Sequence, residues 1–397
     1  MHRLSTALGM PQHRFASIHV VGTNGKSSVT RMIAALLEAH GLRTGACVSP
    51  HAERWSERVL IGGREIDAAA FASAVERAAQ AAEAVNRGLE ERDAVTQFEL
   101  ATAAAFVAFA AARVEVAVIE AGLGGRLDAT NTIPSRVTVL TSIGLDHTAF
   151  LGDTELEIAA EKLAVLRDHT TLVRGRVSPE VADLVARTAA ARGAEPIVAP
   201  DDPGEEVRLR APGRFQRRNF ALARAAAEAF LGELDPAAVT GVAGTLVVPG
   251  RLERIAAEPP IFLDVAHNPD GAAALAEALS EVAGGGRVVA CLAVLADKDA
   301  EAMVRALAPV LELAVCTELA PTALEARGLP GIASHSAAKL AAACASAGVA
   351  AEQVPELAAA LHRARALAGA RDGGVLLVTG SHYLLAPARA VLGLCED

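Results

Sequence analysis

The sequence has few cysteines, and they are not arranged as a disulfide framework or a zinc site. There are five cysteines, an odd number, and no two of them form a CxxC pair: Cys47, Cys291, Cys316, Cys344 and Cys395. Disulfide scaffolds and zinc sites depend on paired or closely spaced cysteines. The first residues, 1–14, also lack the apolar segment of a secretory signal. We therefore expect a cytoplasmic protein with reduced thiols.

Aromatic residues and an excess of basic charge are lacking too. There is one Trp and one Tyr, and 37 basic residues stand against 47 acidic ones, for a net charge of -10. Single-strand binding uses aromatic stacking, and duplex binding needs a basic face. No apolar run is long enough to span a bilayer without a glycine, proline or charge. We expect neither nucleic acid nor membrane as a partner, and a monomer that acts on small molecules.

The chain has ample material for two domains with buried cores, since 52% of its 397 residues are hydrophobic. Short apolar runs alternate with helical stretches, a rhythm typical of a mostly parallel α/β sheet. The rhythm restarts after Pro249-Gly250, so we predict domains at 1–248 and 249–397. The predicted strands are 17–21, 114–120, 137–141 and 171–174, then 261–264, 288–292, 313–316 and 375–379; the predicted helices include 27–40, 97–113, 155–167, 270–279, 300–307 and 355–367. The Ala-rich region 335–353 gives no clear strand order.

The strongest functional pattern lies between the first predicted strand and the first amphipathic helix. Glycines allow a loop to wrap phosphates, backbone amides and the helix N-terminus supply positive potential, and a lysine neutralises the β/γ charge. Val20 stands where a regular GxxxxGK[ST] loop has its first glycine. The alternative is a tight turn with a surface lysine, which the flanking elements disfavour. The candidate phosphate-binding residues are Gly22, Thr23, Asn24, Gly25, Lys26, Ser27 and Ser28.

Two more loops follow predicted strands and carry groups that can bind a cation. Glu120 ends one strand and precedes the glycine-rich stretch 121–131, and His147 follows the next strand. The carboxyl ends of parallel strands are where α/β sheets bind ligands, so we predict that both residues hold one Mg²⁺. An N-capping or surface acid and a structural histidine are the alternatives. Lys162 lies in a helical stretch, where a lysine is normally solvated.

The ordered set of motifs resembles the folylpolyglutamate synthase/dihydrofolate synthase family of Mur-type ligases. The likeness runs from about Ile18 to Tyr383. It implies a Mur ligase central-type P-loop domain and a smaller, Rossmann-like C-terminal α/β domain. The motifs are GTNGK, SPH, EAGLGGRLDATN, LDHTAFLG, PGRFQRRN, PGRLE, DVAHNP and TGS.

The resemblance implies a role for individual residues. ATP phosphates would lie at Lys26, Ser27 and Ser28, with Arg251 reaching them from the second domain. Lys162 matches the lysine that becomes carbamylated in this family. The remaining implied roles are Mg²⁺ binding by Ser49, Glu120 and His147, adenine contacts by Gln216 and Asn219, a ribose contact by Asp264, glutamate contacts by His267 and Ser381, and pterin contacts by Phe98 and Asp128.

The implied reaction joins L-glutamate to a folate, and in bifunctional members to dihydropteroate, through an acyl phosphate formed with ATP. Some residues depart from the family pattern: Ser27 replaces a glycine, residues 163–167 read LAVLR, and His382 replaces an apolar residue. Little chain precedes Gln12, whereas members often carry an N-terminal helix that contributes to pterin binding. This difference weakens the expectation for dihydropteroate more than for a folate.

Three other functions remain open from the sequence. A Mur-type ligase acting on a UDP-sugar peptide would share the ATP chemistry, but the EAGLGGRLDATN and SPH motifs disfavour it. A nucleotide-dependent switch would bind ATP without ligation, and the metal-binding residues disfavour that reading. A non-catalytic homologue is the third alternative, although every proposed ligand is chemically competent.

Overall fold

The computed structural model describes residues 1–90, 93–325 and 331–392. The chain forms two compact units, which are described separately. The N-terminal unit comprises Met1–Arg210 and Arg217–Leu246, and the C-terminal unit comprises Ala211–Gln216 and Val247–Asp397. Within the described ranges, no helix is both long and apolar enough to cross a membrane.

The N-terminal unit is built on a mostly parallel sheet. Its central strands are buried and almost continuously apolar, as expected for a sheet covered on both faces. Antiparallel pairing occurs at one edge, between β2 and β3 and between β3 and β4. Across the described part of the sheet the order is β4 (Arg64–Glu65), β3 (Val59–Ile61), β2 (Thr44–Cys47), β5 (Val116–Glu120), β1 (Ala16–Val21), β6 (Val137–Leu140), β7 (Thr171–Arg174) and β8 (Glu195–Val198).

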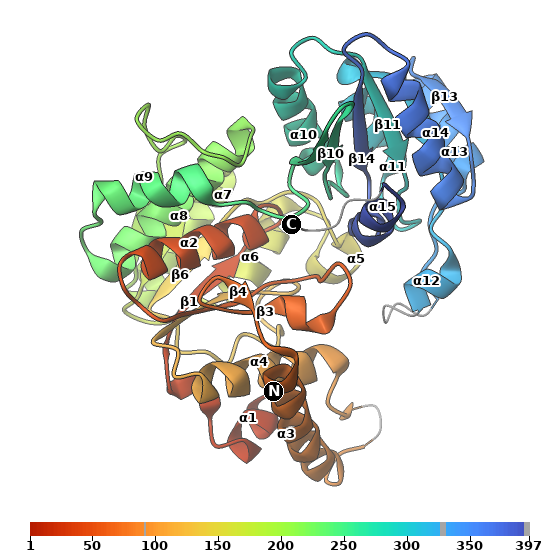
Figure 1. Ribbon diagram of the computed structural model, residues 1–397. Helices are drawn as coiled ribbons and strands as arrows, with labels where there is room; N and C mark the ends of the chain where they lie inside the picture. The colour runs from red at the N-terminus through yellow and green to blue at the C-terminus, as the bar shows by residue number, and fades with distance from the viewer. Residues whose placement is uncertain (91–92, 326–330, 393–397) are drawn as a thin grey trace. The chain divides into compact units, whose positions relative to one another are not determined.

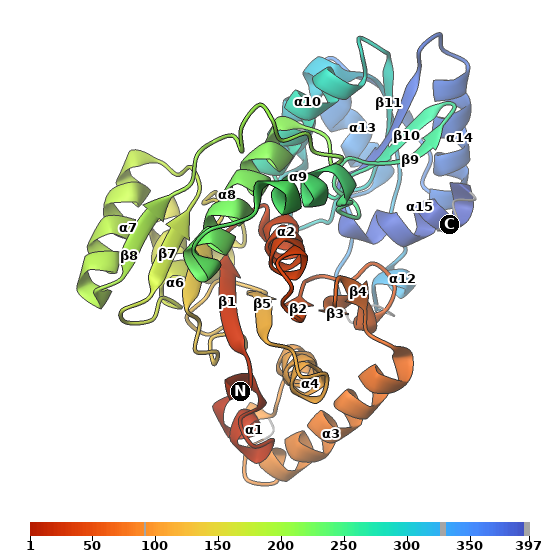
Figure 2. The same ribbon diagram turned by 60° about the vertical axis from the view of Figure 1, so that its left-hand side comes forward.

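Helices cover both faces of this sheet. Figures 1 and 2 show α2 on one side of β1 and β5, and α4 on the other. Phe106 and Phe109 of α4 pack in one core cluster with Ala117 and Ile119 of β5. The helices of this unit include α1 (His2–Ala7), α2 (Lys26–Ala39), α3 (Ala68–Asn86), α4 (Gln97–Ala111), α5 (Thr148–Leu151), α6 (Glu155–Leu163), α7 (Pro179–Arg192) and α9 (Pro236–Thr245), with 3₁₀ turns at Pro11–His13 and Trp55–Arg58.

The segment before Gln12 does form a helix, α1, contrary to what its shortness suggested. Leu4 and Leu8 are buried in the cluster that α3 and α4 also build. A short helix is therefore present at this place in the chain.

The C-terminal unit is a second, smaller α/β layer. All neighbouring strands are parallel except β9 and β10. Its core includes Leu275 and Leu279 of one helix, Met303 of the next, and Leu292 and Leu377 of central strands. In the described ranges the order is β13 (Ala350–Gln353), β12 (Leu311–Cys316), β11 (Val288–Leu292), β14 (Val375–Thr379), β10 (Pro260–Leu263) and β9 (Glu253–Ala257), with α10 (Pro269–Val282), α11 (Ala300–Leu307), α12 (Pro321–Glu325), α13 (Ala337–Ser346), α14 (Leu357–Gly369) and α15 (Leu385–Leu392).

The predicted α/β fold class is confirmed, and several element boundaries are corrected. The helix predicted at 97–113 ends at Ala111, before Arg113 takes a left-handed backbone conformation. The helix predicted at 155–167 ends at Leu163. The strand predicted at 114–120 begins at Val116. One further helix, α8 (Arg214–Leu231), starts in the C-terminal unit and continues into the N-terminal unit.

Candidate active site

The phosphate loop connects β1 to α2, and its two glycines are required by their surroundings. Gly25 precedes α2 in a left-handed conformation with φ +84°. A Cβ on Gly22 would lie 1.9 Å from Oγ1 of Thr141, and one on Gly25 would lie 2.6 Å from Oδ1 of Asn219. Only glycine therefore allows the loop to pack this closely against its neighbours.

The loop after β6 holds the phosphate loop in place. The Thr141 hydroxyl donates to the Asn24 carbonyl at 2.6 Å, and the Asn24 amide donates to the Ser142 hydroxyl at 3.0 Å. The Thr23 amide donates to the Ser142 carbonyl at 2.8 Å, and the Gly144 amide donates to the Thr23 hydroxyl at 3.2 Å. The phosphate loop is thus preorganised by a second loop rather than by its own glycines alone. Sequence reasoning assigned only His147 in that second loop and missed these contacts, although a Thr-Ser pair directly after a strand was a usable signal.

Two lysine amines meet at one carbonyl of the phosphate loop. Nζ of Lys162 donates to the Gly22 oxygen at 2.8 Å, and Nζ of Lys26 donates to the same oxygen at 3.1 Å. The two nitrogens therefore lie within about 6 Å of each other. Lys162 is only 4% exposed, so the alternative of an ordinary solvated helix lysine is wrong. Burial, and then the charge of Lys26, lower the pKa of Lys162 to about 7, against the opposing effects of Asp146 and Asp128.

Glu120 is buried at the end of β5, where two segments contact its carboxylate. The Ser27 hydroxyl donates to Oε1 at 3.0 Å, and the Ser49 amide donates to Oε2 at 3.0 Å. The Ser27 hydroxyl also lies 3.1 Å from the Ser49 carbonyl. The structure thus places the backbone of Ser49, together with the Ser27 side chain, against Glu120. A carboxylate beside a hydroxyl is an oxygen donor set that suits a hard divalent cation.

His147 lies in the loop after β6, on the other side of β1 from Glu120 in the strand order. Its side chain is 41% exposed, and its Nε2 lies 3.9 Å from Oδ2 of Asp146. Among the described residues there is no group of three or more His, Cys, Asp and Glu side chains arranged for a metal. A cation here would therefore depend on few protein ligands and on oxygens of water or phosphate, as is usual for Mg²⁺.

The glycine-rich loop after β5 packs on both Phe98 and α6. A Cβ on Gly122 would lie 2.4 Å from Cζ of Phe98, and one on Gly125 would lie 2.6 Å from the Glu161 carbonyl. Asp128 organises the loop, since its carboxylate accepts from the Leu123 amide at 2.8 Å and from the Thr130 amide at 2.9 Å. Phe98 of α4 therefore contacts the loop that Asp128 organises, and the same loop packs on α6, the helix that carries Lys162. At the tip of this loop the Leu127 side chain is 93% exposed.

In the C-terminal unit, the predicted residues gather at the carboxyl ends of β10 and β14. Asp264 is buried and accepts from the Leu252 amide at 2.7 Å and the Ala266 amide at 2.8 Å. Burial raises the pKa of Asp264, while Arg251, the two amides and His267 act in the opposite direction. Ser381 is also buried, just beyond β14, and its hydroxyl accepts from the Tyr383 amide at 3.3 Å.

The two predicted adenine contacts both lie on α8. Asn219 belongs to the N-terminal unit, and its side-chain oxygen lies against Gly25 of the phosphate loop. Gln216 is fully buried and belongs to the C-terminal unit. The structure therefore brings Asn219 to the phosphate loop.

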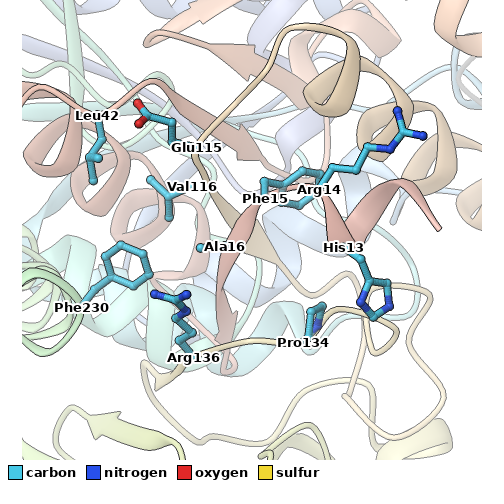
Figure 3. Close-up of a pocket in the computed structure, with 10 residues that line it drawn as sticks. All are labelled: His13, Arg14, Phe15, Ala16, Leu42, Glu115, Val116, Pro134, Arg136 and Phe230. Atoms are coloured by element: carbon cyan, nitrogen blue, oxygen red, sulfur yellow. The ribbon is translucent and has the colours of Figure 1, made fainter.

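A cavity of about 710 Å³ lies at the amino ends of the parallel strands of the N-terminal sheet, near the starts of β1 and β5. Figure 3 shows Arg136 turned toward the Phe230 ring, while the guanidinium of Arg14 points away from both. The guanidinium carbon of Arg136 lies 5.9 Å from the centroid of the Phe230 ring. The charged groups of this cavity do not converge. It lies at the strand ends remote from the phosphate loop, so we place the candidate active site at the carboxyl edge instead.

Comparison with known proteins matches both parts of the chain to ligase families. The Mur ligase middle domain family matches residues 20–192, and the Mur ligase glutamate ligase domain family matches residues 250–382. The chain is 36% identical over 367 residues to a dihydrofolate synthase/folylpolyglutamate synthase of Mycobacterium tuberculosis, covering 82% of this chain and 75% of that protein.

Two solved structures extend the likeness to the fold. Mycobacterium tuberculosis folylpolyglutamate synthase complexed with ADP gives a TM-score of 0.90 at 32% identity, covering 100% of this chain and 94% of that chain. A bifunctional folylpolyglutamate synthase/dihydrofolate synthase with Mn, AMPPNP and L-glutamate bound gives 0.82 at 29% identity, covering 99% and 94%. The chain therefore belongs to the folylpolyglutamate synthase/dihydrofolate synthase family, whose members are ATP-dependent Mur-type ligases.

Proposed function

We propose that this enzyme uses ATP and a divalent cation to join the amino group of L-glutamate to the carboxylate of a folate. One observation carries the proposal: the Lys26 and Lys162 amines converge on the phosphate loop, and the buried carboxylate of Glu120 lies on the Ser27 hydroxyl of the same loop. This arrangement offers the Lys26 cation for phosphate oxygens, a second amine that can be modified, and hard oxygen ligands for a metal at one edge of the sheet. Family membership supplies the acceptor and the amine.

The reaction proceeds in two steps. A carboxylate oxygen of the folate attacks the γ-phosphorus of ATP, the bond to the β–γ bridging oxygen breaks, and ADP leaves. The glutamate nitrogen then attacks the acyl carbon of the resulting acyl phosphate. The tetrahedral intermediate loses its proton from nitrogen and expels inorganic phosphate as the amide forms. Little covalent chemistry is required of the protein, which must position the reactants and stabilise charge.

The protein's contribution is largely electrostatic. Lys26 and the amides of residues 22–28 would neutralise the β- and γ-phosphates, and Arg251 would add a cation from the C-terminal unit. Glu120, the hydroxyls of Ser27 and Ser49, and His147 would hold Mg²⁺. A bound Mg²⁺ would withdraw charge from the phosphoryl oxygens during transfer.

Lys162 is proposed to become carbamylated. Carbamylation needs the neutral amine, and a pKa of about 7 leaves much of the Lys162 amine neutral near physiological pH. The modification would replace a buried ammonium beside Lys26 with an anion that the Lys26 charge stabilises. Bicarbonate should restore activity to CO₂-depleted wild-type protein and leave Lys162→Ala unchanged. Wild-type activity that is indifferent to bicarbonate, with the unmodified mass at Lys162, would rule the carbamate out.

Further substrate contacts are proposed for the other residues that the family resemblance singles out. Gln216 and Asn219 would contact adenine, and Asp264 the ribose through lone pairs that its backbone partners leave available. Phe98 and Asp128 would receive the pterin side of the acceptor, and His267 and Ser381 the incoming glutamate. Dihydropteroate is proposed as a second acceptor, supported by the buried helix α1 and by the bifunctional name of the Mycobacterium tuberculosis relative.

The division into an ATP-binding domain, 1–248, and a glutamate-ligase domain, 249–397, remains a proposal. The cytoplasmic location and the monomeric state are also proposals. Release of a folded, ATP-binding fragment by proteolysis near residue 248 would support the domain division. Sedimentation of the purified protein would decide the oligomeric state.

A substrate panel tests the function directly. Dihydropteroate, tetrahydrofolate, 10-formyltetrahydrofolate and a UDP-sugar peptide would each be incubated with ATP, Mg²⁺ and L-glutamate. We expect glutamate-dependent phosphate release and a product heavier by one glutamyl residue with at least one folate. Product formed only from the UDP-sugar peptide would favour the other ligase class, and ATP binding without any product would favour the switch.

A further inference from the structure

A histidine lies in the middle of the buried sheet, at a position where an apolar residue would be expected. His19 of β1 is fully buried and pairs in register with Ile119 of β5, so its ring is on the α4-covered face. Its Nε2 lies 2.8 Å from Oγ1 of Thr130, which is also fully buried. A polar ring at such a place is costly unless it is hydrogen-bonded, so this contact with the loop after β5 requires an explanation.

The hydrogen-bond chain assigns the tautomer of His19. The Thr130 hydroxyl donates its hydrogen to Oδ1 of Asp128, since a carboxylate oxygen accepts. Because the hydroxyl hydrogen of Thr130 is donated to Asp128, the hydroxyl oxygen of Thr130 must accept the hydrogen bond from His19. Nε2 carries the proton, and Nδ1 is buried without a hydrogen-bond partner in the structure. Burial, and then the charge of Arg167, lower the pKa of His19 to about 3, in agreement with a neutral ring.

Asp128 connects the His19–Thr130 hydrogen bond to the rest of the loop. One oxygen accepts from the Thr130 amide and hydroxyl, and the other accepts from the Leu123 amide. The two ends of the loop are therefore tied through a single carboxylate. On its far side, the Arg167 guanidinium donates to the carbonyl and the side-chain oxygen of Asn131 at 2.7 and 2.8 Å. The loop that contacts Phe98 is thereby fixed to β1 and to the chain after α6.

We propose that His19 is a positioning residue for the folate side of the site: through Thr130 it orients Asp128 and fixes the loop 121–131 against Phe98. The inference rests on the proposed function, because Phe98 and Asp128 are the residues assigned to the pterin. His19 touches no substrate in this scheme. Its hydrogen bond holds the glycine-rich loop to the rigid strand β1. Without that bond the loop would sample many conformations.

A purely structural His19 would have different consequences. If it served only to fill the core, its loss would lower stability and affect the KM values of ATP, glutamate and the acceptor alike. A positioning role instead predicts a selective effect on the acceptor, because the phosphate loop is held by separate bonds from Thr141 and Ser142.

The decisive variant is Thr130→Val, which removes the hydroxyl with little change of shape. We expect the KM for the folate to rise about tenfold, the order expected for one lost hydrogen bond, and the KM for ATP to change less than twofold. Thr130→Ser keeps a hydroxyl and should restore the wild-type KM. Thr132→Val is the matched control, because Thr132 lies in the same segment and makes only a 3.4 Å contact to the Ala129 carbonyl.

His19→Phe and the double variant test whether His19 acts through Thr130. Each single variant should raise the folate KM, and the double variant should raise it no further than Thr130→Val alone. Additive effects, or equal changes in the KM for ATP and folate, would overturn the proposal.

Amide hydrogen exchange provides a readout that does not depend on activity. The amides of Leu123 and Thr130 both donate to Asp128, so Thr130→Val should accelerate exchange across 122–131 and leave 22–28 unchanged. Unchanged exchange across 122–131 would refute the positioning role even if the enzyme ligates glutamate. Failure of wild-type ligation would instead refute the proposed function, and the exchange result would then decide only whether the Thr130 hydroxyl orders the loop 122–131.

Discussion

The two units each place a buried carboxylate at the carboxyl end of a strand, yet the partners of the two carboxylates differ. Glu120 is the last residue of β5 and is 3% exposed, and Asp264 directly follows β10 and is 4% exposed. The contacts of Glu120 include the Ser27 hydroxyl and the Ser49 amide, whereas the backbone amides of Leu252 and Ala266, from two separate segments, donate to Asp264. A hydroxyl can rotate away or join the ligands of a cation, but backbone amides are fixed by the chain.

We infer from this difference that Glu120 can exchange a partner for a ligand, whereas Asp264 stabilises the backbone conformation around it. Leu252, whose amide donates to Asp264, has φ +46°, a conformation that is unfavourable for leucine. Asp264 thus holds the turn that presents Arg251, while Glu120 keeps a replaceable partner. The same position in two similar sheets supports two tasks.

The largest expected effect is in the N-terminal unit, with Lys26→Ala. Loss of the phosphate-loop cation should lower kcat/KM by about 10⁴-fold, or about 5 kcal/mol, as for other charges placed on a transferred phosphoryl group. Lys339→Ala, on an exposed position of α13, is the control and should retain activity. Steady-state phosphate release measures both. Activity of Lys26→Ala within tenfold of wild type would contradict the phosphate-loop assignment.

Next in size is a pH-dependent stability difference at Lys162. Folded Lys162 has a pKa of about 7, and the unfolded lysine keeps 10.5. The unfolded chain therefore binds a proton between these values that the folded chain does not, and stability falls as pH drops through this window. Between pH 9.5 and pH 7 in CO₂-free buffer, wild type should lose about 3 kcal/mol relative to Lys162→Met. Urea unfolding at both pH values measures the change. Parallel stability curves would show that the lysine is not buried as a neutral amine.

The comparison of the two carboxylates is tested by the matched pair Glu120→Gln and Asp264→Asn. Glu120→Gln should lower activity about a hundredfold through weaker metal binding, with little loss of stability. Asp264→Asn places an amide nitrogen against a backbone N–H, and should lower the free energy of unfolding by about 2 kcal/mol. Activity, Mn²⁺ titration and thermal unfolding should be measured for both. Equal losses of stability in the two variants would show that Glu120 and Asp264 support the fold to the same extent.

The smallest effect is expected at the contact that holds the phosphate loop. Thr141→Val removes the hydrogen bond to the Asn24 carbonyl and should raise the KM for ATP several-fold, or about 1 kcal/mol. The folate KM should be unchanged, the reverse of the pattern expected for Thr130→Val. A KM for ATP equal to that of wild type would show that the other contacts suffice to order the loop.

Much of this protein could be read from local sequence. Strands buried on both faces, such as β1 and β5, are almost continuously apolar, and their ends are marked by the phosphate loop and by Glu120. Edge strands were missed because they lack that signal: β4 and β8 are largely exposed, and β8 contains Pro196. β2 was missed because it contains Gly45, where a Cβ would lie 2.8 Å from the Phe109 ring.

The tertiary structure alone decided which groups meet. By itself the sequence determined the α/β class, the phosphate loop and the candidate acids, because backbone periodicity and glycine placement are local properties. It could not show that Lys162 lies on the Gly22 carbonyl, 140 residues away, or that Thr130 joins His19 to Asp128. A helical lysine and a strand histidine look alike whether solvated or buried. Their protonation and contacts are set by neighbours that only the folded sheet brings together.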